Sequence, residues 1–184
     1  MSFISRKVFV FNPFQENTFV LSDETGECVI VDAGCMNPAE EKQLEEYIRA
    51  KGLKPVGLIN THCHVDHVFG NGFVLRKYGL STRCHPDDIS LLEGAAGQAS
   101  LFGLEISPPP PPGDPLSEGD TIRFGNTFLE VIHVPGHSPG GIALHAPEDN
   151  FLLAGDVLFK GGIGRTDLPG GDYHVLLDAI RNKL

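Results

Sequence analysis

The segment Thr61-His62-Cys63-His64-Val65-Asp66-His67 constrains this chain more than any other stretch. Three histidines and one aspartate fall within six consecutive positions, in the pattern H-x-H-x-D-H. The apolar run before it, Val56-Gly57-Leu58-Ile59, predicts a buried strand. The fold must therefore place a strand end where polar side chains can gather.

The residue types in this cluster are those that bind metal ions. Imidazole is the commonest metal ligand, and a carboxylate beside it suits zinc, iron or manganese. His62 and His64 are two residues apart on an extended segment, so their side chains point to one side. Asp66 and His67 begin a predicted helix and approach from another angle, so the turn supplies one metal or two neighbouring ones. Period-2 alternation turns Cys63 away from the ligands.

Two further strand ends carry polar residues of the same kind. His137 follows a predicted strand within Val134-Pro-Gly-His-Ser-Pro-Gly-Gly141, and Asp156 ends an apolar run. A carboxylate there is costly unless it is paired or bound to metal. His137 taken alone fits a core histidine equally well, but three polar strand ends together favour a shared metal site. Asp32, at a third strand end, is either a turn former or the partner of a metal-bound histidine.

Composition excludes several classes of function. Apolar content of 41% and charged content of 21% are ordinary for a globular domain. A net charge of −10 disfavours a nucleic-acid partner, which would require a basic face. No run approaches the roughly 20 apolar residues of a membrane span, and the N-terminal residues lack a signal-peptide core. We therefore expect a cytoplasmic protein without a membrane partner, with its four cysteines reduced.

Strand and helix patterns occur twice along the chain. The expected strands are 8–11, 18–21, 28–31, 56–59, 82–84, 121–124, 128–133, 141–145 and 151–154, with helices at 38–51, 66–78, 86–92 and 173–183. Asn37 and Asp172 are the expected N-caps of the first and last helices. Gly70 and Gly72 indicate either close backbone approach or a later start of the second helix.

The repeated pattern predicts an α+β fold, a four-layer αββα sandwich in one domain over residues 1–184. Its half-units are about 1–93 and 119–184. A loop over 94–118, weak in regular structure, joins them and includes the prolines 108–112. We interpret this loop as a crossover between half-units rather than a peptide-recognition segment.

At these residues the sequence resembles the metallo-β-lactamase fold superfamily. The matching segments are D-A-G at 32–34, T-H-C-H-V-D-H at 61–67, P-G-H-S-P-G-G at 135–141 and G-D at 155–156, in the family's order. Residues 155–159 and the G-I-G-R-T-D segment at 162–167 resemble the glyoxalase II branch (hydroxyacylglutathione hydrolases), above all its short bacterial members. The persulfide dioxygenases share G-R-T-D.

The resemblance implies a role for each candidate residue. One metal would be held by His62, His64 and His137; Asp66 and His67 would hold a second; and Asp156 would bridge them. Asp32 would orient a ligand from behind, and Arg165 would grip the glutathione carboxylate. An arginine paired with Asp167 or Asp172 is the alternative for Arg165. The family adds a histidine in a later P-G-H-G-type segment, so we expect this chain to lack the C-terminal end of the fold.

The implied activity is hydrolysis of a thioester, hydroxyacylglutathione of the S-lactoylglutathione type, by a metal-bridging hydroxide. Zinc is the expected cofactor, as one or two ions, with iron or manganese possible. Asp66 would orient the hydroxide as well as bind metal, and a thiolate leaving group needs little protonation. The first alternative is an iron-dependent glutathione persulfide dioxygenase using His62, His137 and Asp156. The second is a metal-binding fold without turnover, because the C-terminal ligand is missing.

Overall fold

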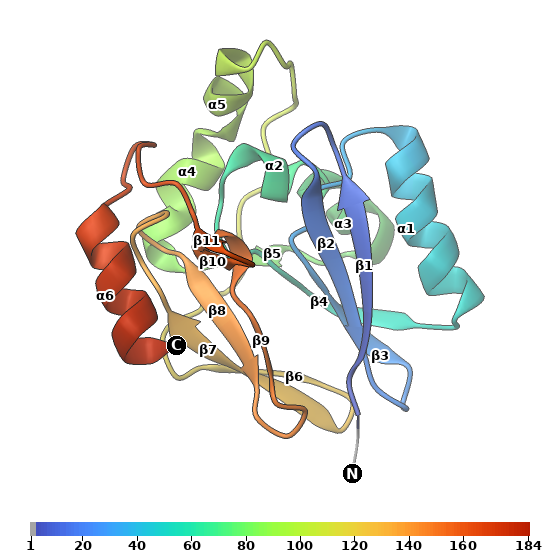
Figure 1. Cartoon of the computed structure of the whole chain (residues 1–184). Coiled ribbons are helices and arrows are strands. Elements are labelled where there is room, and N and C mark those ends of the chain that lie inside the picture. The colour runs from blue at the N-terminus through green and yellow to red at the C-terminus, as the bar shows by residue number, and fades with distance from the viewer. Residues whose placement is uncertain (1–2) are drawn as a thin grey trace.

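The computed structural model describes residues 3–184, and in it two β-sheets stack face to face with helices on both outer sides (Figure 1). The first sheet has the order β1-β2-β3-β4-β5. Its strands are β1 (Ser5–Phe11), β2 (Glu16–Ser22), β3 (Glu27–Val31), β4 (Lys54–Ile59) and β5 (Thr82–Arg83). Strands β1 to β3 form an antiparallel meander, whereas β3, β4 and β5 run parallel. The carboxyl ends of these parallel strands therefore meet at one edge of the sheet.

The second sheet is an antiparallel meander in the order β6-β7-β8-β9. Its strands are β6 (Thr121–Phe124), β7 (Thr127–His133), β8 (Ile142–Ala146) and β9 (Phe151–Leu153). A backbone hydrogen bond of 2.8 Å, donated by Ile142 N to Thr61 O, links the first residue of β8 to the histidine-rich segment after β4. The polar strand ends of both sheets are thus joined at one edge of the sandwich.

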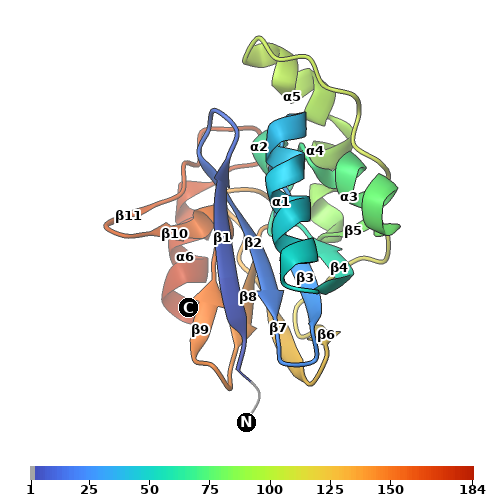
Figure 2. The same cartoon turned by 90° about the vertical axis from the view of Figure 1, so that its right-hand side faces the viewer.

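Helices cover the two outer faces. α1 (Pro38–Ala50) and α3 (Asn71–Tyr78) lie outside the first sheet, and α6 (Tyr173–Lys183) lies outside the second (Figures 1 and 2). Short helical segments α2 (Val65–Val68), η1 (Pro86–Asp88) and α4 (Ile89–Glu93) lie at the edge that carries the histidines, and η2 (Gly155–Val157) follows β9. The predicted αββα architecture is confirmed.

Three apolar layers hold the sandwich together. Between the sheets, Val29 and Ile59 of the first pack with Leu129 and Leu144 of the second. On the outer face of the first sheet, Leu44 of α1 lies in a second apolar cluster. Leu176 and Ala179 of α6 pack with Val134 and Ala143 on the outer face of the second sheet. Each sheet is therefore buried on both faces, which explains the near-continuous apolar runs of β3 and β4.

The long helices start where the sequence predicts. The Asn37 side chain accepts hydrogen bonds from the backbone N–H groups of Ala39 and Glu40, and Asp172 accepts equivalent bonds from His174 and Val175. Both side chains satisfy donors that have no partner within the helix. The predicted N-caps are confirmed.

Three details of the chain path differ from the sequence-based expectation. The interval 94–118 contains a helix, α5 (Ala95–Leu101), whose Ala95 and Ala99 are buried, so the expectation of a loop throughout was wrong there. The expected helix at 66–78 is two helices, because Gly70 N donates to Ala33 O at 2.7 Å between α2 and α3. A hairpin of β10 (Leu158–Phe159) and β11 (Gly162–Ile163) lies within the segment that follows Asp156.

Among the described residues, no helix is both long enough and apolar enough to cross a membrane.

Candidate metal centre

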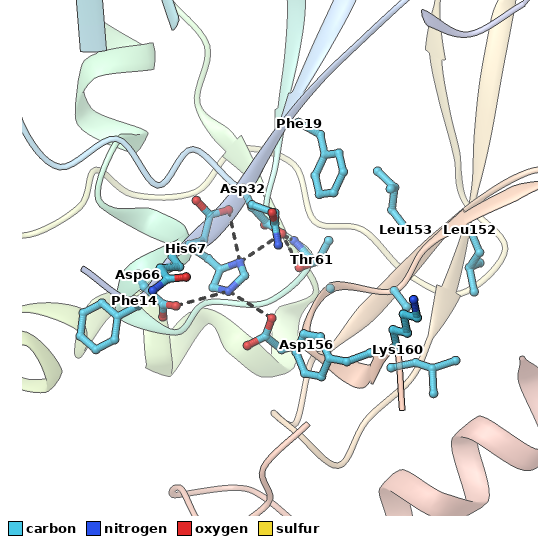
Figure 3. A pocket seen from close by; sticks show the side chains of 17 residues that line it. Phe14, Phe19, Asp32, Thr61, Asp66, His67, Leu152, Leu153, Asp156 and Lys160 are labelled. Carbon is cyan, nitrogen blue, oxygen red and sulfur yellow. Dashed lines mark hydrogen bonds and ion pairs between the residues drawn. The ribbon is translucent and has the colours of Figure 1, made fainter. Parts of the chain in front are cut away.

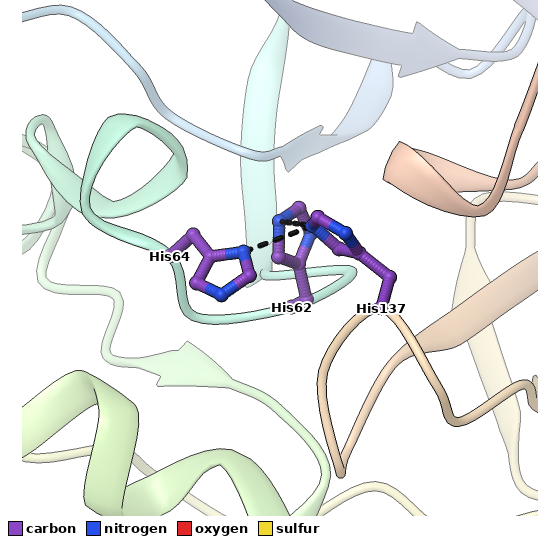
Figure 4. Close-up of side chains that lie close together, drawn as sticks. All are labelled: His62, His64 and His137. Carbon is purple, nitrogen blue, oxygen red and sulfur yellow. Dashed lines mark hydrogen bonds between the residues drawn. The ribbon is translucent and has the colours of Figure 1, made fainter. Parts of the chain in front are cut away.

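Three imidazole rings from the two half-units converge on one point (Figure 4). His137 Nε2 lies 3.2 Å from His62 Nε2 and 2.9 Å from His64 Nδ1. All three residues are buried, and each offers a nitrogen within 4.8 Å of the others. The extended backbone predicted to aim His62 and His64 to one side does so, and the P-G-H-S-P-G-G turn brings His137 to meet them.

Hydrogen bonds on the far side of two rings define which nitrogens carry protons. His137 Nδ1 donates to the carbonyl oxygen of Arg165 at 2.8 Å, which leaves His137 Nε2 as a bare lone pair. The Thr61 hydroxyl donates to Asp32 Oδ2 at 2.6 Å, so its oxygen accepts from His62 Nδ1 at 3.2 Å. His62 Nε2 is then also a lone pair, facing that of His137.

Two nitrogen lone pairs facing each other at 3.2 Å repel unless a cation lies between them. Burial, reinforced by the neighbouring imidazoles, lowers the pKa of His62 well below its usual value. Burial, followed by His137 and His67, lowers the pKa of His64 to about 3. The His62 and His64 rings are therefore neutral at physiological pH, the form in which histidine binds metal. The donor set fits a divalent metal ion.

A second set of ligand-type atoms surrounds His67 (Figure 3). His67 Nε2 lies 3.6 Å from Asp66 Oδ2 and 3.6 Å from Asp156 Oδ1. The other oxygen of Asp156 lies 3.8 Å from His137 Nε2, in the three-histidine set. The Asp156 carboxylate therefore lies between the two sets.

Asp32 lies on the side of the His67 ring opposite Asp66 and Asp156. Asp32 Oδ2 lies 3.2 Å from His67 Nδ1, and Asp32 Oδ1 accepts a 2.7 Å bond from the backbone N–H of Thr61. A carboxylate on the far nitrogen fixes the tautomer and orientation of a metal-binding histidine. One aspartate thus acts on both sets, on His67 directly and on His62 through Thr61.

The charges of the second set are strongly coupled. Burial lowers the pKa of His67, but Asp32, Asp156 and Asp66 outweigh it and leave that pKa well above its usual value. Burial raises the pKa of Asp156, but the hydrogen bond and charge of His67 leave it lowered. Burial raises the pKa of Asp66. The cluster concentrates carboxylates where a divalent ion would replace the His67 proton as the compensating charge.

Two glycines allow the backbone to approach the site. A Cβ at Gly155, which has φ +51°, would lie 2.5 Å from Thr61 Oγ1. A Cβ at Gly164 would collide with the carbonyl oxygen of Asp156 and lie 3.1 Å from His137 Nδ1. The glycine before Asp156 and the one before Arg165 are therefore required by close packing around the ligands.

The second set opens into a cavity of about 560 Å³. Its polar floor includes Asp66, His67 and Asp156. Its walls are largely apolar, and Lys160 is the cation among the lining residues (Figure 3). The apolar lining residues are Phe14, Phe19, Leu152, Leu153, Ala154, Leu158 and Phe159. The cavity suits a small molecule with one reacting group over the floor.

Sequence reasoning missed two residues of this cavity. Glu16 is buried, accepts a 2.8 Å hydrogen bond from Thr18 Oγ1, and has its Oε1 3.9 Å from His67 Nδ1. Burial raises its pKa to about 9. Lys160 lies in the segment after Asp156, where the sequence directs attention to Arg165 instead. Neither residue belongs to a spacing pattern. The only sequence signal for Glu16 is that an acidic residue lies just before the predicted strand 18–21.

The structure places Arg165 and Cys63 away from the cavity. The guanidinium of Arg165 makes two 2.7 Å hydrogen bonds to Asp167, and its side chain is exposed. Its contact with the site is through its backbone carbonyl, on His137. Cys63 is buried in an apolar cluster with Cys84, on the side away from the imidazoles, as the alternation predicted.

Comparisons with known proteins found a family model and several relatives. A family model described as "Metallo-beta-lactamase superfamily" matches residues 11–184. "Hydroxyacylglutathione hydrolase GloC" of Haemophilus influenzae is 35% identical over 173 residues, which are 93% of this chain and 80% of that protein. The mouse protein "Persulfide dioxygenase ETHE1, mitochondrial" is 36% identical over 168 residues, 91% of this chain and 58% of that protein.

The crystal structure of TTHA1623 in a di-iron-bound form is similar throughout. It superposes with a TM-score of 0.84 at 36% identity, covering 95% of this chain and 84% of that one.

Proposed function

This chain belongs to the metallo-beta-lactamase superfamily, and from that premise we propose that it is a metal-dependent thioesterase acting on hydroxyacylglutathione. The main support for this proposal is the presence of two neighbouring sets of ligand-type side chains with Asp156 between them. The first would consist of His62, His64 and His137, and the second of Asp66 and His67. Zinc is the proposed occupant, as one or two ions, and iron or manganese suits the same donors.

When bound by these residues, a divalent metal would lower the pKa of a water molecule and polarise a carbonyl oxygen. The protein's own residues define the rest. Asp66 lines the cavity floor, where its carboxylate would accept a hydrogen bond from the attacking water and orient it. Asp32 and Thr61 hold the histidines in the required tautomers. The leaving thiol has a pKa near 8.5, so it departs as a thiolate without a dedicated acid.

The cavity supports a small substrate that is part apolar and part anionic. Phe14, Phe19 and Leu153 give an apolar wall, and Lys160 is the cation among the lining residues. Arg165, the expected contact of the glutathione carboxylate, must leave Asp167 to reach a substrate. That exchange costs little because the pair is exposed. We propose Lys160 as the first contact of a substrate carboxylate and Arg165 as the second.

An iron-dependent persulfide dioxygenase is the second candidate. It is supported by the likeness to ETHE1 and by the presence of two histidines and one carboxylate, His62, His137 and Asp156, in the candidate centre. The position of His64, 2.9 Å from His137 Nε2, favours the hydrolase, because it completes a three-histidine set.

One comparison of reactions separates the two candidates. Samples of the metal-free protein loaded with zinc, manganese or iron are assayed for S-lactoylglutathione hydrolysis and, separately, for oxygen uptake with glutathione persulfide. We expect thioester hydrolysis with zinc, and a raised KM in Lys160→Gln at nearly unchanged kcat. Oxygen uptake with iron in the absence of any thioester hydrolysis would contradict the hydrolase.

A further inference from the structure

Asp88 is a fully buried carboxylate that belongs to neither ligand set. It is the last residue of η1, and its relative exposure is 0%. A buried carboxylate is costly unless its oxygens accept hydrogen bonds. Three donors bind it, and all three come from the loops that carry the imidazoles.

The hydrogen bonds of Asp88 join the two half-units at the metal centre. Asp88 Oδ2 accepts from the backbone N–H of Cys63 at 2.9 Å and from the hydroxyl of Ser138 at 2.9 Å. Asp88 Oδ1 accepts from the backbone N–H of Gly140 at 2.6 Å. Cys63 lies between His62 and His64, and Ser138 directly follows His137. One side chain therefore holds both segments that carry the three rings.

The loop around His137 is shaped to receive this carboxylate. A Cβ at Gly140 would lie 2.7 Å from the backbone nitrogen of Asp88 and 2.9 Å from its Cγ, so only glycine allows the approach. Ser138 is fully buried, and its hydroxyl has no exposure to water. Bonds to an ionised carboxylate are stronger than neutral ones, so the spacing of the two segments is firmly held.

We propose that Asp88 is a positioning residue that sets the distance between His137 and the His62–His64 pair, and thereby the metal affinity of the three-histidine set. The inference rests on the proposed metal centre and not on the reaction catalysed there. Partners behind the ligands of a metal commonly change its affinity 10- to 100-fold when they are replaced.

The test is a cobalt titration of the metal-free protein, read by the visible absorption of bound Co²⁺ and by competition with a chelator. Asp88→Asn keeps the shape of the side chain but turns one acceptor into a donor, which faces an N–H or hydroxyl donor. We expect its cobalt affinity to fall at least about 10-fold, with an altered Co²⁺ spectrum and unchanged far-UV circular dichroism. The matched control is Asp114→Asn, the same change at an exposed aspartate outside the candidate metal sites, which should leave both readouts unchanged.

Ser138→Ala removes one of the three bonds and leaves both backbone donors in place. We expect a smaller loss of affinity, about two- to fivefold by comparison with the full effect. It tests the inference even where Asp88→Asn fails to fold. Affinities within twofold of the parent and an identical spectrum in the folded variants would overturn the inference. A parent that binds cobalt but hydrolyses no thioester would instead overturn the proposed function alone.

Discussion

The Nε2 atoms of His62 and His137 face each other without protons, because each ring donates a hydrogen bond through its Nδ1. The Thr61 hydroxyl oxygen accepts a hydrogen bond from His62 Nδ1, and the Arg165 carbonyl accepts one from His137 Nδ1. At the proposed metal centre, affinity should therefore depend on the hydrogen-bond partners of the histidines as well as on the histidines themselves.

Glu16 gives a prediction for single-residue chemistry. Its folded-state pKa of about 9 lies above the ordinary value of 4.5 because the carboxyl is buried beside Asp32 and Asp66. The unfolded chain loses this proton above about pH 4.5, and the folded chain keeps it until about pH 9. Folding stability from this group is therefore present at acid pH and is lost as the pH rises between those values.

Glu16→Gln removes this titration while keeping the side chain's size. We expect the metal-free variant to be more stable than its parent at pH 8 by roughly 1 kcal/mol or more, since each pKa unit is worth about 1.4 kcal/mol. The difference should shrink toward pH 5. Urea unfolding at both pH values measures it, with Glu105→Gln, an exposed site, as the control. A Glu16→Gln protein less stable than its parent at both pH values would refute the argument.

The candidate ligand residues could be predicted from the sequence, but the residues that contact and orient them could not. The cluster at 61–67, His137 and Asp156 follow apolar runs, so chain order alone marks them. Asp88 accepts a hydrogen bond from Ser138, which is fifty positions away in the sequence. Glu16 lies beside His67, and two strands and a helix separate them along the chain. Such partners depend on the tertiary fold, and no local spacing encodes them.

Among the elements, those with clear caps and amphipathic spacing were predicted best. α6 has the predicted bounds, and α1 begins at the predicted Pro38. α5 was missed because Gly97 lies in its middle and its buried face consists of small residues, Ala95 and Ala99. The break between α2 and α3 depends on Gly70 meeting Ala33, a tertiary contact.

Asn37 gives a prediction for α1. Its side-chain oxygen accepts from Ala39 N at 3.0 Å and from Glu40 N at 3.1 Å. Asn37→Ala leaves these donors without a side-chain partner and should cost about 1 kcal/mol of stability. Thermal unfolding at fixed metal content should show a Tm lowered by roughly 2–4 °C. Asn37→Asp keeps the acceptor and should behave like the parent; equal loss in both variants would show that the cap bond is not responsible.

At the scale of the whole molecule, two stacked sheets bring together segments that are far apart in sequence. The inter-sheet core fixes β4 against β8, and the bond from Ile142 N to Thr61 O closes the edge where the ligands lie. The αββα layers were predictable because the strand and helix pattern occurs twice. The cavity and its cation at Lys160 were not, since loops and the β10–β11 hairpin shape that rim.

In the proposed function, residues from both half-units hold a metal that the reaction requires. The most direct measurement is a zinc titration of the metal-free protein that follows bound zinc and S-lactoylglutathione hydrolysis together. We predict that activity rises with bound zinc and saturates, that His137→Ala loses both, and that His145→Ala, a histidine at the exposed side of β8, loses neither. Zinc bound in full with no hydrolysis, or hydrolysis that does not depend on zinc, would contradict the proposed function.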